Sequence, residues 1–307
     1  MSPGRPSRRG VHLPPAVIRA GIGQIGHRVL NPALAWDVQR HRLSQLSGGP
    51  PLPRGTTVSR TVLGGVPADV LTAADANSGP TVVHFHGGGY CVGSPGLARA
   101  WAARLSARAG CRVVLPDYRL APAHPYPAAL DDARSVLKAV RAEAGTGQFV
   151  LSGDSAGGGL ALALTMSLRD EGGEPPAGCI LLSPWLDLAA DRRSDPGLVR
   201  RDVLLTPSWL EACAVAYASP GRWAEHHVSP LRADLRSLPP LLVQAGSDEL
   251  LAPDAQRLTA AASAAGTEVT YSLWPGLWHD FPLQAGLLAA ADSAVAQAAW
   301  FVRSVTP

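Results

Sequence analysis

The pentapeptide Gly-Asp-Ser-Ala-Gly at residues 153–157 places a serine between two glycines and could carry nucleophilic chemistry. A Gly-x-Ser-x-Gly pattern builds a sharp strand-to-helix turn that exposes the serine oxygen. Residues 148–152 before it are typical of a short buried strand, and the Ala- and Leu-rich residues 158–168 are typical of a helix. A turn that only packs can share this pattern, so the chemistry needs support from elsewhere in the chain.

A second group, His86-Gly87-Gly88-Gly89, follows the predicted strand at 81–85 and could supply backbone donors. A serine that attacks a carbonyl needs N–H groups aimed at the developing oxyanion in a water-poor site. Glycines can turn their N–H groups into a cavity because no Cβ stands in the way. We therefore predict an oxyanion hole formed by Gly88, Gly89 and Ala156, the residue after the serine.

Further motifs extend well beyond these two. They are Tyr118-Arg119-Leu120-Ala121-Pro122, the stretch 125–132, Ser183-Pro184-Trp185-Leu186-Asp187, Ser229-Pro230-Leu231 and Trp278-His279-Asp280-Phe281. With them the chain resembles the hormone-sensitive-lipase-like family of bacterial carboxylesterases over residues 55–305. The resemblance implies an α/β-hydrolase fold with a mostly parallel eight-stranded sheet, a helical cap and hydrolysis of short-chain apolar esters. Gly159 departs from the family, which often has Asn there.

A base for the serine is predicted from chain order. Serine is a weak nucleophile and needs a histidine held by a carboxylate, and in this fold the acid and then the histidine follow the serine. His279 lies between a strand-like run at 268–274 and an Ala-rich helix at 283–302, where this fold places its base. Such a base predicts that activity falls as the pH drops through about 6–7. His226 and His227 precede the next strand and are expected at the surface or beside the pocket.

The acid is expected after the strand at 241–245. Asp248 is the first carboxylate there and matches the acid position of the family, so we predict Asp248 as the third catalytic residue. Glu249 is expected to point elsewhere, and Asp254 to lie in the first turn of a helix, where the dipole favours it. Asp280 adjoins His279 in the chain and is expected to be structural rather than to reach the ring productively.

Alternating strands and helices predict a mainly parallel sheet covered on both faces. The expected strands span 56–63, 67–71, 81–85, 111–116, 148–152, 178–183, 240–245 and 268–274. The expected helices span 95–109, 127–144, 156–170, 254–265 and 283–303.

Two segments break this alternation and contain helical patterns. We interpret 1–50 as an N-terminal cap segment and 186–228 as a cap insertion, with 51–185 and 229–307 as the two parts of the catalytic domain. Alternatively, 1–50 covers the edge of the sheet. Tyr90, Trp185 and Trp209 are predicted to contact the substrate. Tryptophans filling the cleft would favour acyl chains from acetyl to hexanoyl.

Composition excludes several classes of function. The net charge of +3 over 307 residues does not require a nucleic-acid partner. No run approaches the ~18 apolar residues of a membrane span. Four scattered cysteines indicate buried thiols in a cytoplasmic protein. The pairs His84-x-His86 and His226-His227 lack a cysteine or carboxylate at a familiar zinc spacing, so neither a metal nor a cofactor is expected.

Alternatives remain at this stage. A lactone hydrolase, or an amide or ester deacetylase of secondary metabolism, would use the same three residues. A ligand-binding receptor on this fold is disfavoured because the base histidine is present. The expected partner is a small-molecule ester, and the chain could also form a homodimer.

Overall fold

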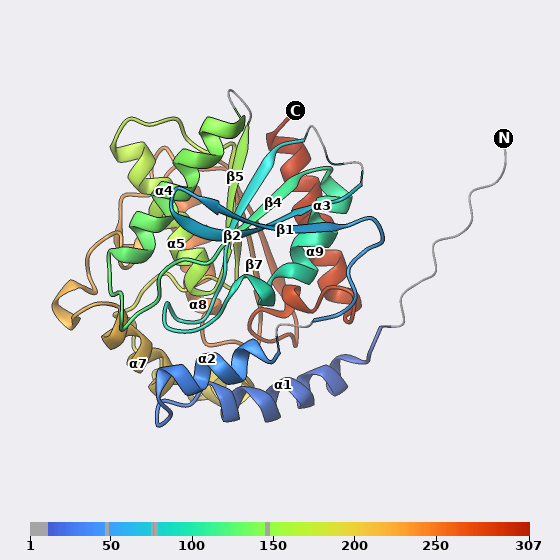
Figure 1. Ribbon diagram of the computed structural model, residues 1–307. Coiled ribbons are helices and arrows are strands. Elements are labelled where there is room, and N and C mark those ends of the chain that lie inside the picture. The colour runs from blue at the N-terminus through green and yellow to red at the C-terminus, as the bar shows by residue number, and fades with distance from the viewer. Residues whose placement is uncertain (1–11, 47–48, 75, 77–78, 145–147) are drawn as a thin grey trace.

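An eight-stranded sheet forms the centre of the computed structural model, which describes residues 12–46, 49–74, 76, 79–144 and 148–307 (Figure 1). The strand order is β1-β2-β4-β3-β5-β6-β7-β8. The bounds are β1 Thr57–Leu63, β2 Val66–Thr72, β3 Thr81–Phe85, β4 Arg112–Pro116, β5 Phe149–Asp154, β6 Gly178–Leu182, β7 Leu241–Gly246 and β8 Val269–Trp274.

The sheet is antiparallel only at one edge. β1 and β2 form a hairpin, β2 pairs antiparallel with β4, and the strands from β4 to β8 pair in parallel. Strand β5 pairs with β3 and β6, so the residue that follows β5 lies at the middle of the sheet. This arrangement confirms the predicted α/β-hydrolase architecture.

Helices cover both faces because side chains along each strand alternate between two apolar clusters. Val83 joins a cluster with α4, α5 and α8, whereas Val82 joins one with α3 and α9. The helices are α1 Pro15–Val29, α2 Trp36–Ser44, α3 Arg99–Ala109, α4 Ala128–Ala144, α5 Ala156–Asp170, α6 Pro196–Arg201, α7 Pro207–Tyr217, α8 Ala252–Ala264 and α9 Ala289–Val305. Among the described residues, none of the helices has the length and apolar character that crossing a membrane needs.

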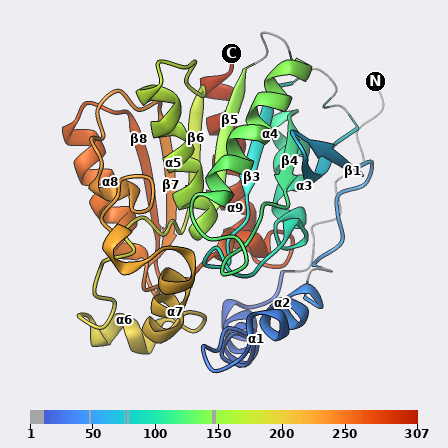
Figure 2. The same ribbon diagram turned by 60° about the vertical axis from the view of Figure 1, so that its left-hand side comes forward.

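Helices α1, α2, α6 and α7 lie together beyond one end of the strands, from two segments far apart in the sequence (Figures 1 and 2). Helix α7 begins where the side chain of Thr206 accepts a hydrogen bond from the Trp209 N–H at 3.2 Å. The Trp209 indole donates to Gln39 Oε1 of α2 at 2.9 Å, and this bond is buried. Helix α1 packs closely on the second segment, since a Cβ on Gly26 would lie 2.8 Å from Leu204 Cδ1.

Candidate active site

Ser155 occupies the turn between β5 and α5 and has φ 53° and ψ −119°. A non-glycine residue with positive φ carries strain, which persists only where the surroundings fix it. The flanking glycines permit the turn because neighbouring backbone comes very close. A Cβ on Gly153 would lie 2.1 Å from the Gly157 carbonyl, and a Cβ on Gly157 would lie 1.9 Å from the Phe85 carbonyl. The close packing of β3, β5 and α5 therefore holds the serine oxygen in a fixed place.

The glycine loop after β3 lies beside this turn. Gly88 and Gly89 have φ angles of 117° and 62°, which residues with a side chain rarely adopt. A Cβ on Gly88 would also lie 2.2 Å from the Val92 carbonyl. Within the described residues, the N–H groups of Gly88, Gly89 and Ala156 donate no hydrogen bond. These three donors are therefore free for an oxyanion, and the predicted hole stays a prediction.

Asp154 holds the glycine loop against the serine turn. Its Oδ2 accepts the Gly87 N–H at 2.8 Å, and its Oδ1 lies 2.9 Å from His84 Nε2. All three groups are buried, so these bonds act in a low-dielectric region. His84 is thus a strand residue that supports Asp154, and the bracing role of Asp154 was missed by the sequence analysis.

The carboxylate beside His279 is Glu249, not Asp248 as predicted. Glu249 is fully buried, and its Oε2 lies 3.2 Å from His279 Nδ1. Asp248 instead accepts a hydrogen bond from Arg19 of α1 at 3.0 Å and lies 3.5 Å from Arg201. Two successive carboxylates in one turn point in different directions. Here Glu249 points toward His279 and Asp248 points toward Arg19 of α1.

Asp280 also departs from expectation, because its Oδ2 lies 3.1 Å from His279 Nε2. The left-handed backbone at Asp280, with φ 56°, allows the two neighbouring side chains to meet. Burial lowers the pKa of His279, but the charges and hydrogen bonds of Asp280 and Glu249 outweigh burial and raise that pKa well above its ordinary value. Burial raises the pKa of Asp280 to about 7. The two carboxylates therefore favour the protonated imidazole.

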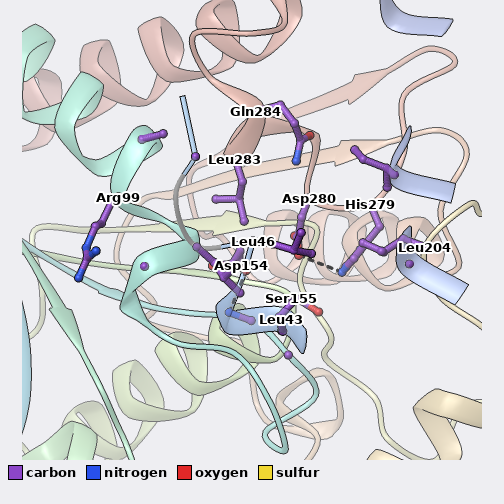
Figure 3. A pocket seen from close by; sticks show the side chains of 18 of the residues that line it. Leu43, Leu46, Arg99, Asp154, Ser155, Leu204, His279, Asp280, Leu283 and Gln284 are labelled. Atoms are coloured by element: carbon purple, nitrogen blue, oxygen red, sulfur yellow. Dashed lines mark hydrogen bonds and ion pairs between the residues drawn. The ribbon is translucent and has the colours of Figure 1, made fainter. Parts of the chain in front are cut away.

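A cavity of about 900 Å³ opens onto Ser155 and His279 (Figure 3). Its wall from α1 is one helical face, formed by Val17, Ile18, Gly21 and Ile22. Most of the remaining wall is aliphatic and comes from Leu30, Leu43, Leu46, Leu52, Leu204, Leu283 and Leu287, among others. Figure 3 shows Arg99, which is ion-paired with Asp69, on the opposite side of the cavity from His279. The cavity is thus an apolar chamber with a polar margin.

Of the three residues predicted to contact substrate, Trp209 lines this chamber and Tyr90 and Trp185 do not. Tyr90 stacks on Tyr217 with ring centroids 3.8 Å apart. Trp185 is buried, and its backbone N–H donates to the Ser155 carbonyl at 2.9 Å. Both residues lie against the start of α5, since a Cβ on Gly159 would lie 2.5 Å from the Trp185 carbonyl and 2.7 Å from the Tyr90 hydroxyl. The premise that tryptophans fill the cleft is therefore not met.

Asp254 lies in the first turn of α8, as predicted, and it is fully buried. Its carboxylate pairs with Arg192 at 2.8 Å and accepts the N–H groups of Leu186 and Asp187. These contacts make it a structural anchor between α8 and the segment after β6.

Comparisons with known proteins agree with this geometry. A model of a family described as having the alpha/beta hydrolase fold matches residues 82–283. An acetyl-hydrolase of Streptomyces hygroscopicus is 37% identical over 255 residues, which are 80% of this chain and 85% of that protein. An esterase of Acinetobacter venetianus is 36% identical over 237 residues, covering 76% of this chain and 77% of that protein.

Solved structures give the same result. An esterase from the bacterial hormone-sensitive lipase family aligns with a TM-score of 0.88 and 32% identity, covering 97% of this chain and 100% of that one. A mutant of the esterase E40 aligns with a TM-score of 0.90 and 32% identity, covering 95% and 99%. The chain belongs to the α/β-hydrolase family, among the carboxylesterases that resemble hormone-sensitive lipase. It is an ester-hydrolysing enzyme.

Proposed function

We propose that this enzyme is a serine carboxylesterase in which Ser155, His279 and Glu249 are the catalytic residues. The observation that carries the proposal is the opening of one apolar chamber onto Ser155, in its strained turn, and onto His279, whose other nitrogen is held by Glu249. A nucleophile, a base and a group that orients the base are the three parts that acyl transfer needs.

The reaction proceeds in two halves. His279 takes the proton of Ser155, the serine oxygen attacks the ester carbonyl, and the free N–H groups of Gly88, Gly89 and Ala156 hold the oxyanion. Collapse expels the alcohol, which receives the proton from His279, and leaves an acyl-Ser155. A water deprotonated by His279 then releases the acid, and Glu249 fixes the tautomer of the imidazole throughout.

Asp280 adds a condition to this mechanism. His279 Nε2 faces Asp280 in the structure, so the ring exchanges this contact for Ser155 before it can act as a base. A protonated imidazole cannot accept the serine proton. Asp280 therefore sets the pH range in which the base is available.

The chamber supports apolar esters as substrates. Ligand cavities of about 300–1,000 Å³ bury most of a drug-sized molecule. At about 900 Å³, with mainly aliphatic walls, this chamber has room for acyl or alcohol groups larger than hexanoyl. We therefore propose medium-length and bulky apolar esters in place of the short chains expected from the sequence.

Ser155→Ala tests the proposal. Turnover of p-nitrophenyl butyrate should fall to a residual rate that the oxyanion hole and substrate binding sustain alone. This rate should be about 10³–10⁴-fold above that of the uncatalysed reaction in water. A fluorophosphonate probe should label the native chain at Ser155 and leave the variant unlabelled. Ser208→Ala, which alters an exposed serine on α7, is the matched control. Full activity in a folded Ser155→Ala variant would refute the mechanism.

Two further expectations belong to this proposal. All four cysteines are free and buried, which supports the predicted cytoplasmic location. The homodimer stays a prediction, which sedimentation of the purified chain will decide.

A further inference from the structure

A second cavity lies at the far end of the nucleophile helix and shares no lining residue with the chamber. It is lined by Asp170, the last residue of α5, and by His226, together with several arginines. His227 follows His226 in the chain. One possible ligand atom from each of Asp170, His226 and His227 lies within 4.8 Å of the others. The carboxylate that the sequence did not place beside this histidine pair is therefore supplied by a distant part of the chain.

The two imidazoles are suited to bind a metal. Their ring centroids are 4.2 Å apart, and Nε2 of His227 is buried with no hydrogen-bond partner in the described part of the chain. A buried nitrogen without a partner lowers the stability of the folded chain unless a ligand binds it. Burial, followed by the charges of His226 and Arg134, lowers the pKa of His227, although Asp170 and Glu171 act in the opposite direction. A neutral imidazole is the form that binds metals.

Asp170 retains a free oxygen. Both contacts from Arg169 go to Oδ1, at 2.8 Å from Nε and 2.7 Å from Nη2. No donor within the described residues contacts Oδ2. A metal can therefore bind Oδ2 while Arg169 keeps its place.

The guanidinium groups nearby do not exclude a cation, because each already has a carboxylate partner. Arg134 pairs with Glu171, Arg232 with Asp187, and Arg236 with Asp234. Arg169 pairs with Asp170 itself, so this carboxylate would be shared between the guanidinium and the metal.

We propose that Asp170, His226 and His227 form a site for a divalent transition metal of the zinc type, with water as the remaining ligand. Two imidazole nitrogens and one carboxylate oxygen are a donor set that zinc accepts, at about 2.0–2.2 Å each. Those bond lengths require ligand atoms roughly 3.3 Å apart. The side chains must close from their present spacing, which their partial exposure to solvent permits.

The consequence of binding would be mechanical rather than catalytic. Helix α5 begins beside Ser155 and ends at Asp170, while His226 and His227 lie between α7 and β7. A metal at this site would clamp the end of the nucleophile helix to the segment that returns from the cap. Because a metal that binds the folded chain alone stabilises it, zinc should raise the melting temperature.

The test uses the full chain after treatment with a chelator and dialysis. Titration with CoCl₂ should give one equivalent of bound cobalt with visible absorption bands, and zinc should displace it. His226→Gln, His227→Gln and Asp170→Asn should each weaken binding by at least about tenfold, since even supporting contacts to metal ligands are worth about 10–100-fold. His124→Gln, at an exposed histidine elsewhere, is the control.

Esterase turnover should be unchanged in all four variants, which shows that they are folded. The proposal is overturned if the native chain takes up no saturable cobalt or zinc. It is equally overturned if binding and the zinc-induced rise in melting temperature persist in the His226→Gln and His227→Gln variants.

Discussion

Replacing the adjacent carboxylates of Glu249 and Asp248 by amides, one at a time, separates the roles of the two residues. In Glu249→Gln the side chain keeps its size but loses the charge beside His279 Nδ1. In Asp248→Asn the change falls on the ion pair with Arg19 of α1. The two variants are matched because each replaces a carboxylate by an amide in the same turn.

The expected effects differ by orders of magnitude. Replacing the carboxylate of a serine triad by an amide favours the wrong tautomer and lowers kcat by about 10⁴-fold. At about 1.36 kcal/mol per factor of ten, this loss is about 5.4 kcal/mol of transition-state stabilisation. The Arg19 and Asp248 side chains are 28% and 17% exposed, so their pair should contribute only about 0.2–1 kcal/mol to stability. Asp248→Asn should therefore lower the melting temperature slightly and leave most turnover intact.

The assay is steady-state hydrolysis of p-nitrophenyl butyrate, with kcat and KM measured separately and thermal melting recorded for both variants. Glu249→Gln should lose kcat with little change in melting temperature. If Asp248→Asn is the inactive variant and Glu249→Gln retains turnover, then the geometry at His279 has been misread.

Two other predictions concern the histidine and the chamber. Because Asp280 raises the pKa of His279, activity should begin to decline, as the pH is lowered, at a pH above the usual pKa of histidine. Asp280→Asn should move that decline to lower pH. A pH–rate profile that is the same in the native enzyme and the variant contradicts this prediction. In the native enzyme, efficiency on p-nitrophenyl esters should rise about fourfold per methylene beyond hexanoyl, since each buried CH₂ contributes about 0.8 kcal/mol. Gly21→Phe should end this rise at shorter chains, because a Cβ on Gly21 meets no atom within 4 Å and its helical face lines the chamber. Gly21→Ala is the control, and identical chain-length profiles in all three proteins would show that α1 does not bound the substrate.

Local patterns were sufficient for much of the fold. Strand β3 and helix α5 have the predicted bounds, because an apolar run and a strand-turn-helix motif are signals within a few neighbouring residues. Helix α9 begins at Ala289 rather than at 283 because Phe281–Gln284 forms a separate turn. Helix α1 extends to Val29, and its Gly26 packs on Leu204 from a segment far away in the chain.

The errors at the site arise from contacts between distant residues. Nothing near Asp248 and Glu249 in the chain shows that Arg19, 229 positions away, binds Asp248. Likewise, Trp185 is a large aromatic residue just after a strand, as a pocket residue often is. Only the folded structure shows that its backbone is bonded to the serine turn. Spacing predicts which turn holds a catalytic group, whereas the direction of each side chain depends on partners that the whole fold brings in.

The buried hydrogen bond between Gln39 and Trp209 also limits the order in which parts of the chain can fold during synthesis. It joins residues 170 positions apart, and the face of α1 that lines the chamber contacts Leu204 in the same late segment. A ribosome releases α1 and α2 long before α7 exists. Until then Val17, Ile18 and Ile22 present an apolar surface with no opposing wall. The first helices made are thus among the last to dock. A nascent chain arrested before Pro207 would expose an apolar face that chaperones bind, in place of a substrate chamber.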